Sequence, residues 1–262
     1  MQTLSRAAAR AGKAGEPLPQ VWPTLTRAKI KPRRGQVTMI AGPPNIGKSL
    51  FALAWAGHMR VPTLYFSADT DSFTATLRAL AFLTGDDMSL IEERLSDPEW
   101  DEYYQGKLAE LGDIHWEFDP SPSVQDIEES IMAYDGMYGE PPALIVVDNL
   151  MNIVGNSDDE MGTLRHSMRA LHHFARKTNA GMMVLHHTRE DSGLRVENCP
   201  PRNAIAGKIT QLPEMVLTLG RRDLFLGVAC VKSRTGPADP SGHTAWWLHM
   251  VPGTVQISEV MT

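Results

Sequence analysis

The chain has few cysteines, no long apolar run and no overall excess of positive charge. Its two cysteines, Cys199 and Cys230, are too few for a disulfide framework, and they lack the C-x-x-C spacing of zinc sites. The longest purely apolar runs, such as residues 143–147, are far shorter than the roughly 20 residues that cross a bilayer, and the N-terminus has no apolar signal-peptide core. We therefore expect a soluble protein of the reducing cytoplasm that has no membrane partner.

Negative charge is concentrated in one segment of the 262-residue chain. The formal net charge is −6, but residues 86–140 alone carry −15, because only Arg94 and Lys107 offset their 17 acidic side chains. The rest of the chain therefore carries +9. Because bound phosphates need a local positive potential, the acidic segment is a poor nucleic-acid surface, whereas the remaining body permits polyanion binding.

Alternating strand and helix patterns predict an α/β fold. Hydrophobic residues make up 42% of the chain, which is enough to bury a core. Apolar runs typical of buried strands lie at residues 36–41, 63–67, 114–118, 143–147 and 182–185. Helical patterns lie at residues 48–59, 72–83, 123–134 and 160–178, with acidic helices after residue 86. Further strands at 214–219, 224–231, 244–250 and 254–257 follow one another without helices. We therefore predict a mainly parallel central sheet flanked by helices, with antiparallel strands at its C-terminal edge.

The first 34 residues are expected to precede the main domain. Prolines at positions 17, 19, 23 and 32 favour an extended lead-in over residues 15–35 rather than a helix. Residues 1–15 are rich in alanine and in basic side chains, which favours a frayed N-terminal helix over a transit peptide or a basic arm. We divide the chain into an arm and linker, residues 1–34, and one domain, residues 35–262, that contains the acidic segment.

A stretch after the first strand matches the phosphate-loop pattern G-x-x-x-x-G-K-[ST]. The residues expected to surround the phosphates are Gly42, Pro43, Pro44, Asn45, Ile46, Gly47, Lys48, Ser49 and Leu50. Because the motif follows a strand and opens a helix, its backbone N–H groups can converge on phosphate oxygens. Lys48 would neutralise the β and γ phosphates, and the Ser49 hydroxyl would bind Mg²⁺. ATP and Mg²⁺ are therefore the expected cofactors, in preference to a glycine-capped turn without a ligand.

Asp148 follows the apolar strand at residues 143–147. A carboxylate at this position can hold the water shell of the magnesium ion of a phosphate-loop enzyme. An aspartate at a strand end can also cap the following turn, but the phosphate loop favours the metal. Ser49 and Asp148 are the predicted metal ligands.

Three more segments complete a family pattern: YFSAD ending at Asp69, VLHHT around His187, and VKSRTGP with Lys232 and Arg234. Together with the phosphate loop and Asp148 they resemble the RecA-like P-loop ATPase superfamily, nearest to the DnaB and RepA type of hexameric replicative helicase. The resemblance runs from about residue 30 to the C-terminus. It implies a RecA-like ATPase core.

The resemblance implies two further catalytic positions near the phosphates. Asp69 takes the place of the carboxylate that polarises the attacking water, where the family usually has the longer Glu, so Asp69 acts through a second water or turns over slowly. Asp71 is a second candidate, and either aspartate could instead cap the following helix. His187 takes the place of the γ-phosphate sensor, with His186 as the alternative because neighbouring residues of a strand face opposite sides.

The resemblance also implies an assembly. Lys232 and Arg234 match cations that reach the γ phosphate of the neighbouring subunit, with Arg234 as an arginine finger in trans and Lys232 as its helper. A homo-oligomer, most simply a closed hexameric ring, follows. The alternative is an exposed hairpin tip without a catalytic role.

Two loops face the central channel in this family, here residues 152–160 and 189–208. The second loop is the better candidate for single-stranded DNA, and we expect Arg195, Arg202 and Lys208 to contact the phosphate backbone. The first loop carries acidic residues that favour helix capping. A solvated loop without a ligand is the alternative for the basic residues.

These features lead to one main functional hypothesis and two alternatives. The main hypothesis is an ATP-dependent motor on single-stranded DNA, a helicase or translocase of replication or recombination in a bacterial, phage or plasmid setting, acting in the bacterial cytoplasm. A Mg²⁺-dependent nuclease acting on DNA structures would use the same metal against a phosphodiester. A slow, nucleotide-gated recombination mediator is favoured by the short Asp69.

Overall fold

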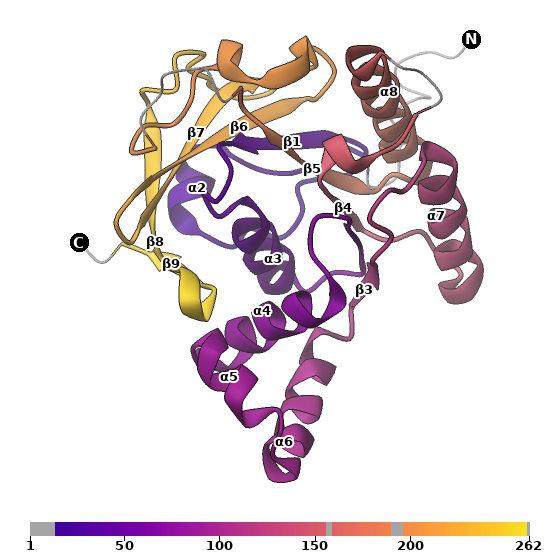
Figure 1. Ribbon diagram of the computed structural model, residues 1–262. Coiled ribbons are helices and arrows are strands. Elements are labelled where there is room, and N and C mark those ends of the chain that lie inside the picture. Colours follow the sequence, from indigo (N-terminus) through magenta and orange to yellow (C-terminus); the bar gives the residue numbers. More distant parts are fainter. Residues whose placement is uncertain (1–13, 156–158, 190–195, 261–262) are drawn as a thin grey trace.

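The computed structural model describes residues 14–155, 159–189 and 196–260, the side chains of Asp101 and Lys208 excepted (Figure 1). In this part of the chain a nine-stranded sheet has the order β3-β2-β4-β5-β1-β6-β7-β8-β9. The strands are β1 (Val37–Gly42), β2 (Thr63–Ser67), β3 (Ile114–Glu117), β4 (Leu144–Asp148), β5 (Gly181–His187), β6 (Met215–Arg222), β7 (Phe225–Ser233), β8 (Ala245–Val251) and β9 (Gln256–Glu259). In this order, each strand of the first six, β3-β2-β4-β5-β1-β6, runs parallel to its neighbours among them. The strands β6-β7-β8-β9 pair antiparallel. The predicted sheet is confirmed.

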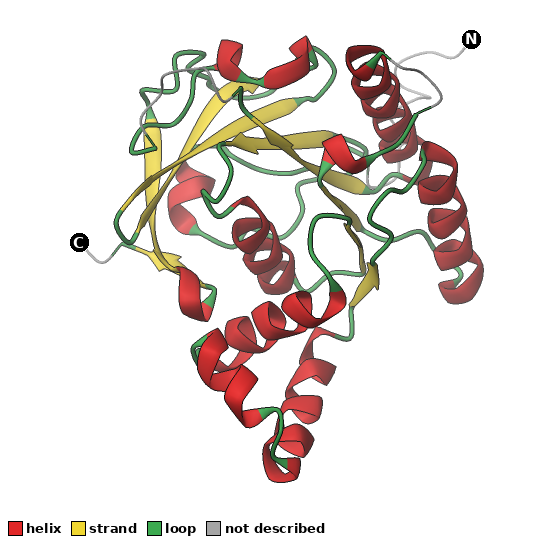
Figure 2. Ribbon diagram, viewed as in Figure 1, coloured by secondary structure: helices red, strands yellow, loops and turns green. Residues whose placement is uncertain are grey.

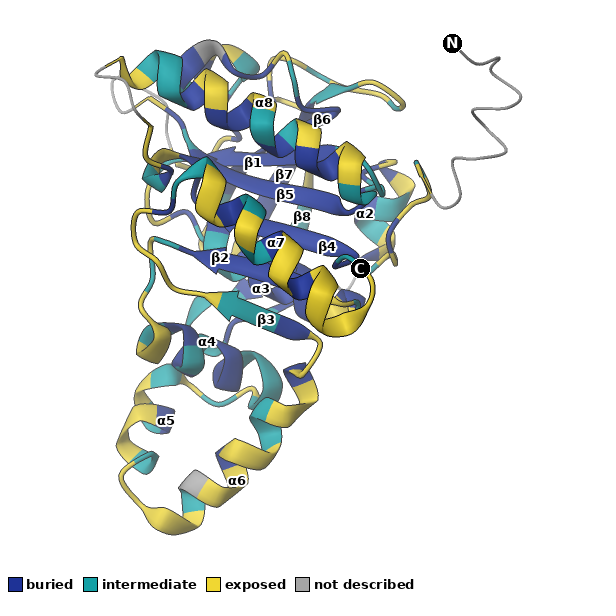
Figure 3. Cartoon of the chain, turned by 90° about the vertical axis from the view of Figure 1, so that its right-hand side faces the viewer, coloured by how far each residue is buried: buried dark blue, intermediate teal, exposed yellow. Residues whose placement is uncertain are grey.

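Helices cover both faces of the sheet (Figure 2). They are α2 (Pro23–Arg27), α3 (Lys48–Met59), α4 (Ser72–Thr84), α5 (Met88–Arg94), α6 (Pro98–Leu108), α7 (Val124–Tyr138) and α8 (Glu160–Thr178). Alternate side chains of β1 point to opposite faces. Ile40 joins the apolar cluster that contains Phe51 of α3, whereas Met39 joins the cluster that contains Met168 of α8. Figure 3 shows α7 and α8 lying across the buried strands.

The lead-in is not extended throughout, because α2 forms at Pro23–Arg27. The prediction was wrong here because a proline in the first turn of a helix removes an N–H group that has no intrahelical acceptor. Trp22, just before the helix, stacks on Phe51 with ring centroids 5.4 Å apart and donates its indole N–H to the Ile257 carbonyl at 3.1 Å. Leu18 and Leu25 are buried in the same cluster, so the lead-in packs into the core.

The first part of the acidic segment, which contains α5 and α6, forms the helical projection at the bottom of Figure 1, whereas β3 and α7 of the same segment belong to the sheet and its cover. A small apolar cluster that includes Leu80, Ile91 and Tyr104 joins these helices to α4. Much of the outer surface of α5 and α6 is exposed (Figure 3). At the other end of the chain, a 3₁₀ turn at Pro252–Thr254 delays the last strand, so β9 begins two residues later than expected. None of the helices in the described ranges is long and apolar enough to span a membrane.

Candidate nucleotide site

The carboxyl ends of four parallel strands bring the predicted residues together. Gly42 at the end of β1 is in register with His187 at the end of β5, and Ser67 at the end of β2 is in register with Asp148 at the end of β4. Asp69 follows β2 by two residues, and its backbone N–H donates to the Asp148 carbonyl at 3.3 Å. In open α/β sheets, ligands bind at this edge.

The phosphate loop turns sharply before helix α3. Gly47 has a φ of 102°, in the left-handed region, and a Cβ atom there would lie 3.2 Å from the Met250 side chain. Glycine is therefore required by the backbone, and a Cβ atom there would also displace the end of the Met250 side chain by a few tenths of an ångström. Helix α3 begins at Lys48, so the N-terminal N–H groups of a 12-residue helix lie at the loop. Such a helix end attracts phosphate oxygens.

Lys48 is a buried cation, only 7% exposed. Its ammonium group donates to the carbonyl oxygens of Gly42 at 3.2 Å and Pro43 at 2.9 Å, and it lies 3.3 Å from Nδ1 of His187. Burial lowers the pKa of Lys48 to about 8, although the carboxylates of Asp148 and Asp69 oppose the shift. A buried ammonium group that burial disfavours fits an anionic ligand such as a phosphate chain.

Asp148 and Ser49 are suited to magnesium. Asp148 is buried, and burial raises its pKa, although a hydrogen bond with the Ser49 side chain opposes the shift. The Tyr65 hydroxyl donates to Oδ2 of Asp148 at 3.3 Å. Within the described residues, no group of three or more His, Cys, Asp or Glu side chains could hold a metal ion. The pair fits Mg²⁺, which in proteins is commonly bound by one or two side chains together with water and substrate phosphates.

Asn149 was missed by the sequence interpretation. Its amide nitrogen donates to Oδ2 of Asp69 at 3.1 Å and lies 3.3 Å from Nε2 of His187. Asn149 thus joins the expected water-polarising carboxylate to the expected sensor, which itself contacts Lys48. A polar residue directly after the metal-binding aspartate was a signal in the sequence, but the two contacts come from β2 and β5 and are not visible along the chain.

The two alternative residues lie elsewhere. Asp71 caps α4, because its carboxylate accepts from the Thr74 N–H at 3.0 Å. His186 points to the other side of the sheet from His187, where it is buried and its Nε2 contacts the Ala206 carbonyl at 3.1 Å. Burial lowers the pKa of His186 to about 4. Asp69 and His187 are thus the members of each pair that lie at the phosphate loop.

Comparisons with known proteins agree with this geometry. A family model described as an AAA domain matches residues 23–193. The chain belongs to the AAA domain family. The Gene 65 protein of Mycobacterium phage L5 is 38% identical over 259 residues, which cover 95% of each chain. The Gene 65 protein of Mycobacterium phage D29 is 37% identical over 233 residues, which cover 85% of this chain and 99% of the relative.

Solved structures show the fold of this AAA domain. One of them, described as an ATPase domain, matches with a TM-score of 0.83 at 16% identity, covering 98% of this chain and 96% of the other. A DnaB-like replicative helicase, whose structure was described with its interactions with primase, matches with the same TM-score and identity and covers 99% of this chain and 68% of the other. The expected RecA-like fold is confirmed.

Lys232 and Arg234 lie at the opposite edge of the sheet from the phosphate loop. Ser233 is in register with Met215, and Met215 with Thr38 near the start of β1. The Lys232 ammonium group donates to the carbonyl oxygens of residues 210, 211 and 213 at 2.8, 2.7 and 2.5 Å. Burial, with the nearby charges of Arg234 and Arg202, lowers the pKa of Lys232 to about 8.

Glu214 holds the backbone of Arg234 in place. The Arg234 N–H donates to the Glu214 carbonyl at 2.9 Å, and the guanidinium lies 3.8 Å from the Glu214 carboxylate. That carboxylate also accepts from the Val37 N–H at 3.0 Å and lies 2.9 Å from Nε2 of His172. Burial alone would raise the pKa of Glu214, but these partners lower it. The Arg234 side chain is 47% exposed and extends from a fixed base.

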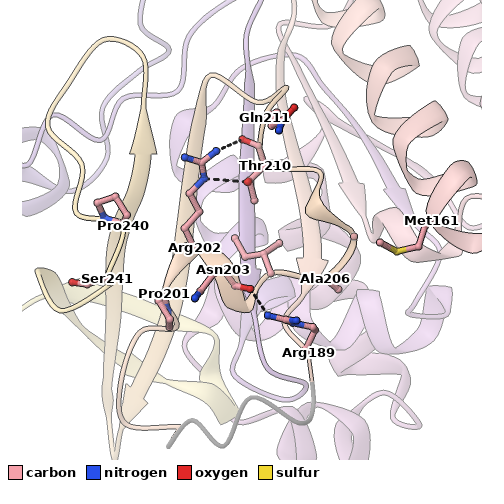
Figure 4. A pocket seen from close by; sticks show the side chains of 12 residues that line it. Met161, Arg189, Pro201, Arg202, Asn203, Ala206, Thr210, Gln211, Pro240 and Ser241 are labelled. Carbon is pink, nitrogen blue, oxygen red and sulfur yellow. Dashed lines mark hydrogen bonds between the residues drawn. The ribbon is translucent and has the colours of Figure 1, made fainter.

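The expected DNA loop is described only in part. Arg195 lies outside the described residues, as does the side chain of Lys208. Arg202 is half-buried, and its guanidinium donates to Oγ1 of Thr210 at 3.1 Å. Figure 4 shows it beside a cavity of about 940 Å³ on the α8 face of the sheet, with Arg189 bonded to the Asn203 carbonyl below. In the other loop, Asp159 caps α8 by accepting from the Met161 N–H at 3.1 Å.

Proposed function

We propose that the protein is an ATP-dependent motor on single-stranded DNA, a helicase or translocase that hydrolyses ATP at the interfaces of a homo-oligomer, with a hexameric ring as the expected assembly. The observation that carries the proposal is the convergence of Lys48, Asp148, Asp69 and His187 at one edge of the sheet. The phage relatives support a place of action in the bacterial host cytoplasm.

Each residue of the site has its own role. The loop N–H groups and Lys48 bind the phosphates. Ser49 and Asp148 would hold Mg²⁺, which would supply positive charge beside the phosphates. Asp69 orients the attacking water and accepts its proton. His187 contacts the γ-phosphate position from the end of β5. Asn149 connects these last two side chains within 3.3 Å.

The position of Arg234 supports catalysis in trans. Its backbone N–H donates to the Glu214 carbonyl, and the Glu214 carboxylate accepts from the N–H of Val37 at the start of β1. Gly42, where the phosphate loop begins, lies five residues further along β1. At 3.3 Å per residue this separation is roughly 17 Å, longer than an arginine side chain. Arg234 therefore has no route to its own phosphate loop and is free to serve a neighbour. Such a finger contributes about 10³- to 10⁵-fold in rate.

Mixed mutants test the shared site. Arg234→Ala and Lys48→Ala subunits are each expected to be inactive, but an equal mixture in exchanging rings pairs an intact loop with an intact finger at about one interface in four. Turnover should therefore recover to about a quarter of the wild-type value if sites fire independently. In a strictly concerted ring no recovery is expected, so wild-type specific activity is also measured on dilution. Constant activity through dissociation would refute the shared site.

The DNA partner is tested in the same assays. ATP turnover of wild type and Lys48→Ala is measured with single-stranded DNA, duplex DNA and RNA, and each reaction is examined on gels for unwinding and cleavage. A motor is stimulated by its nucleic acid track. Unstimulated turnover would favour the second candidate, a slow nucleotide-gated recombination mediator, which the short Asp69 side chain supports. Cleavage without ATP would indicate a nuclease.

A further inference from the structure

Asn149 holds a fixed orientation between two elements of the site. It is only 3% exposed. Its side-chain oxygen accepts from the Met151 N–H at 2.8 Å, and its nitrogen donates to Asp69 at 3.1 Å. Rotating the Asn149 amide by half a turn would place its oxygen against the Asp69 carboxylate and its NH₂ group against the Met151 N–H. The two hydrogen bonds therefore fix the amide with its nitrogen toward His187.

His187 consequently lies between two donors. The Lys48 ammonium group is 3.3 Å from Nδ1, and the Asn149 NH₂ group is 3.3 Å from Nε2. A neutral imidazole has one acceptor nitrogen and one N–H, so it accepts from only one of these neighbours at a time. Lys48 and Asn149 therefore compete for the acceptor nitrogen of the ring. The charged donor forms the stronger hydrogen bond.

We propose that Asn149 is a positioning residue that sets the tautomer of His187. When Lys48 turns from His187 toward a phosphate, Nε2 accepts from Asn149 and the ring proton resides on Nδ1. The Nδ1–H group then faces the position that Lys48 has left and can donate to a phosphate oxygen. The second N–H of the same amide keeps the Asp69 carboxylate in place. One side chain thus prepares both the sensor and the water-polarising group.

This inference rests on the proposed function for its consequence, but the tautomer can be measured without ATP. The full-length protein is labelled with ¹⁵N-histidine, and the His187 signals are identified by their loss in His187→Gln. Under alkaline conditions the imidazole nitrogen shifts report which nitrogen carries the proton. The measurement is made in a Lys48→Ala background, where the competing donor at Nδ1 is removed.

The expected result is a reversal of the tautomer. In Lys48→Ala, the Asn149 amide still donates toward Nε2, so Nε2 should be unprotonated and Nδ1 protonated. In Lys48→Ala/Asn149→Asp, a carboxylate replaces the amide nitrogen, so Nε2 should carry the proton. Asn152→Asp in the same background is the matched control, because the Asn152 amide nitrogen donates to backbone carbonyls, those of Ala68 and Pro120. An unchanged tautomer in the Asn149→Asp protein would overturn the inference.

Turnover supplies a second, independent measurement. Asn149→Ala should lower kcat roughly 10- to 100-fold, as loss of an orienting partner typically does, with little change in KM for ATP. The effect should shrink in a His187→Ala background, since residues that act through one another are not additive. Full additivity, or a change confined to KM, would refute the positioning role. If wild type shows no ATP hydrolysis, the proposed function fails while the tautomer result still stands.

Discussion

Replacement of Lys48 by methionine should abolish ATP hydrolysis and also change how stability depends on pH. In the folded protein burial lowers the pKa of Lys48 from 10.5 to about 8. The unfolded chain therefore holds this proton more firmly than the folded chain does. Between pH 8 and 10.5 the unfolded state binds more protons, so the free energy of unfolding rises with pH across this window.

The magnitude follows from the size of the shift. A change from 10.5 to about 8 in the pKa of a side chain that is 7% exposed corresponds to about 3 kcal/mol. Below pH 8 Lys48 is charged in both states and above pH 10.5 it is neutral in both, so the gain is confined to the interval between them. Lys48→Met has no such group and should lack this rise.

The assay is urea denaturation without nucleotide, followed by tryptophan fluorescence at several pH values. The wild type and Lys48→Met are compared by the difference between their unfolding free energies at each pH, because contributions from other groups, such as Lys232, cancel in this difference. Lys107→Met is the control. Its ammonium group lies 2.7 Å from Glu110 on the exposed projection, and this partner raises the pKa of Lys107, so the window near pH 8 should be unaffected. If the difference in unfolding free energy between the wild type and Lys48→Met does not change with pH, the reasoning about burial is refuted.

Five further substitutions, in three experiments, test separate parts of the molecule. Asp69→Asn and Asp148→Asn should both lose hydrolysis, but only Asp148→Asn should weaken Mg²⁺-dependent ATP binding in equilibrium titrations; equal weakening would contradict the division of roles. Lys232→Met should lower the unfolding free energy by roughly 1 to 3 kcal/mol, because three carbonyl oxygens lose their shortest hydrogen bond, whereas the exposed Arg234→Ala should change it by under about 0.5 kcal/mol. Arg202→Ala should weaken DNA binding for all sequences and reduce the salt-dependence slope by about one; an unchanged slope would place the DNA contact elsewhere.

Much of the fold could be predicted from the sequence because its signals are local. The buried parallel strands appear as short apolar runs, and the phosphate loop has a fixed spacing that only a strand-to-helix turn supports. Helix α2 was not predicted, since its stability comes from Trp22 packing on Phe51 and bonding to Ile257, far along the chain. Prolines alone argued against a helix there, and tertiary packing reversed that preference.

The candidate site could be predicted residue by residue but not contact by contact. Asp69, Asp148 and His187 follow strands whose carboxyl ends meet, so their proximity was expected from a parallel sheet. The Asn149 contacts were not, because they depend on which way a side chain turns after β4. The carbonyl partners of Lys232 are likewise set by the backbone of residues 210–213, which no side-chain pattern reveals.

The two cations of the VKSRTGP segment, Lys232 and Arg234, differ in how firmly their own chain holds them. Lys232 uses its three N–H donors on carbonyl oxygens of its own chain, so reaching a neighbour's phosphate would require breaking three hydrogen bonds. Among the described residues, the Arg234 guanidinium has two long contacts, at 3.3 Å, to the carbonyls of Gln211 and Leu212, and a carboxylate at 3.8 Å, so it can be redirected at little cost. Lys232 therefore stiffens the segment from which Arg234, the proposed finger, projects, and a side chain on a stiff base loses less conformational entropy on binding.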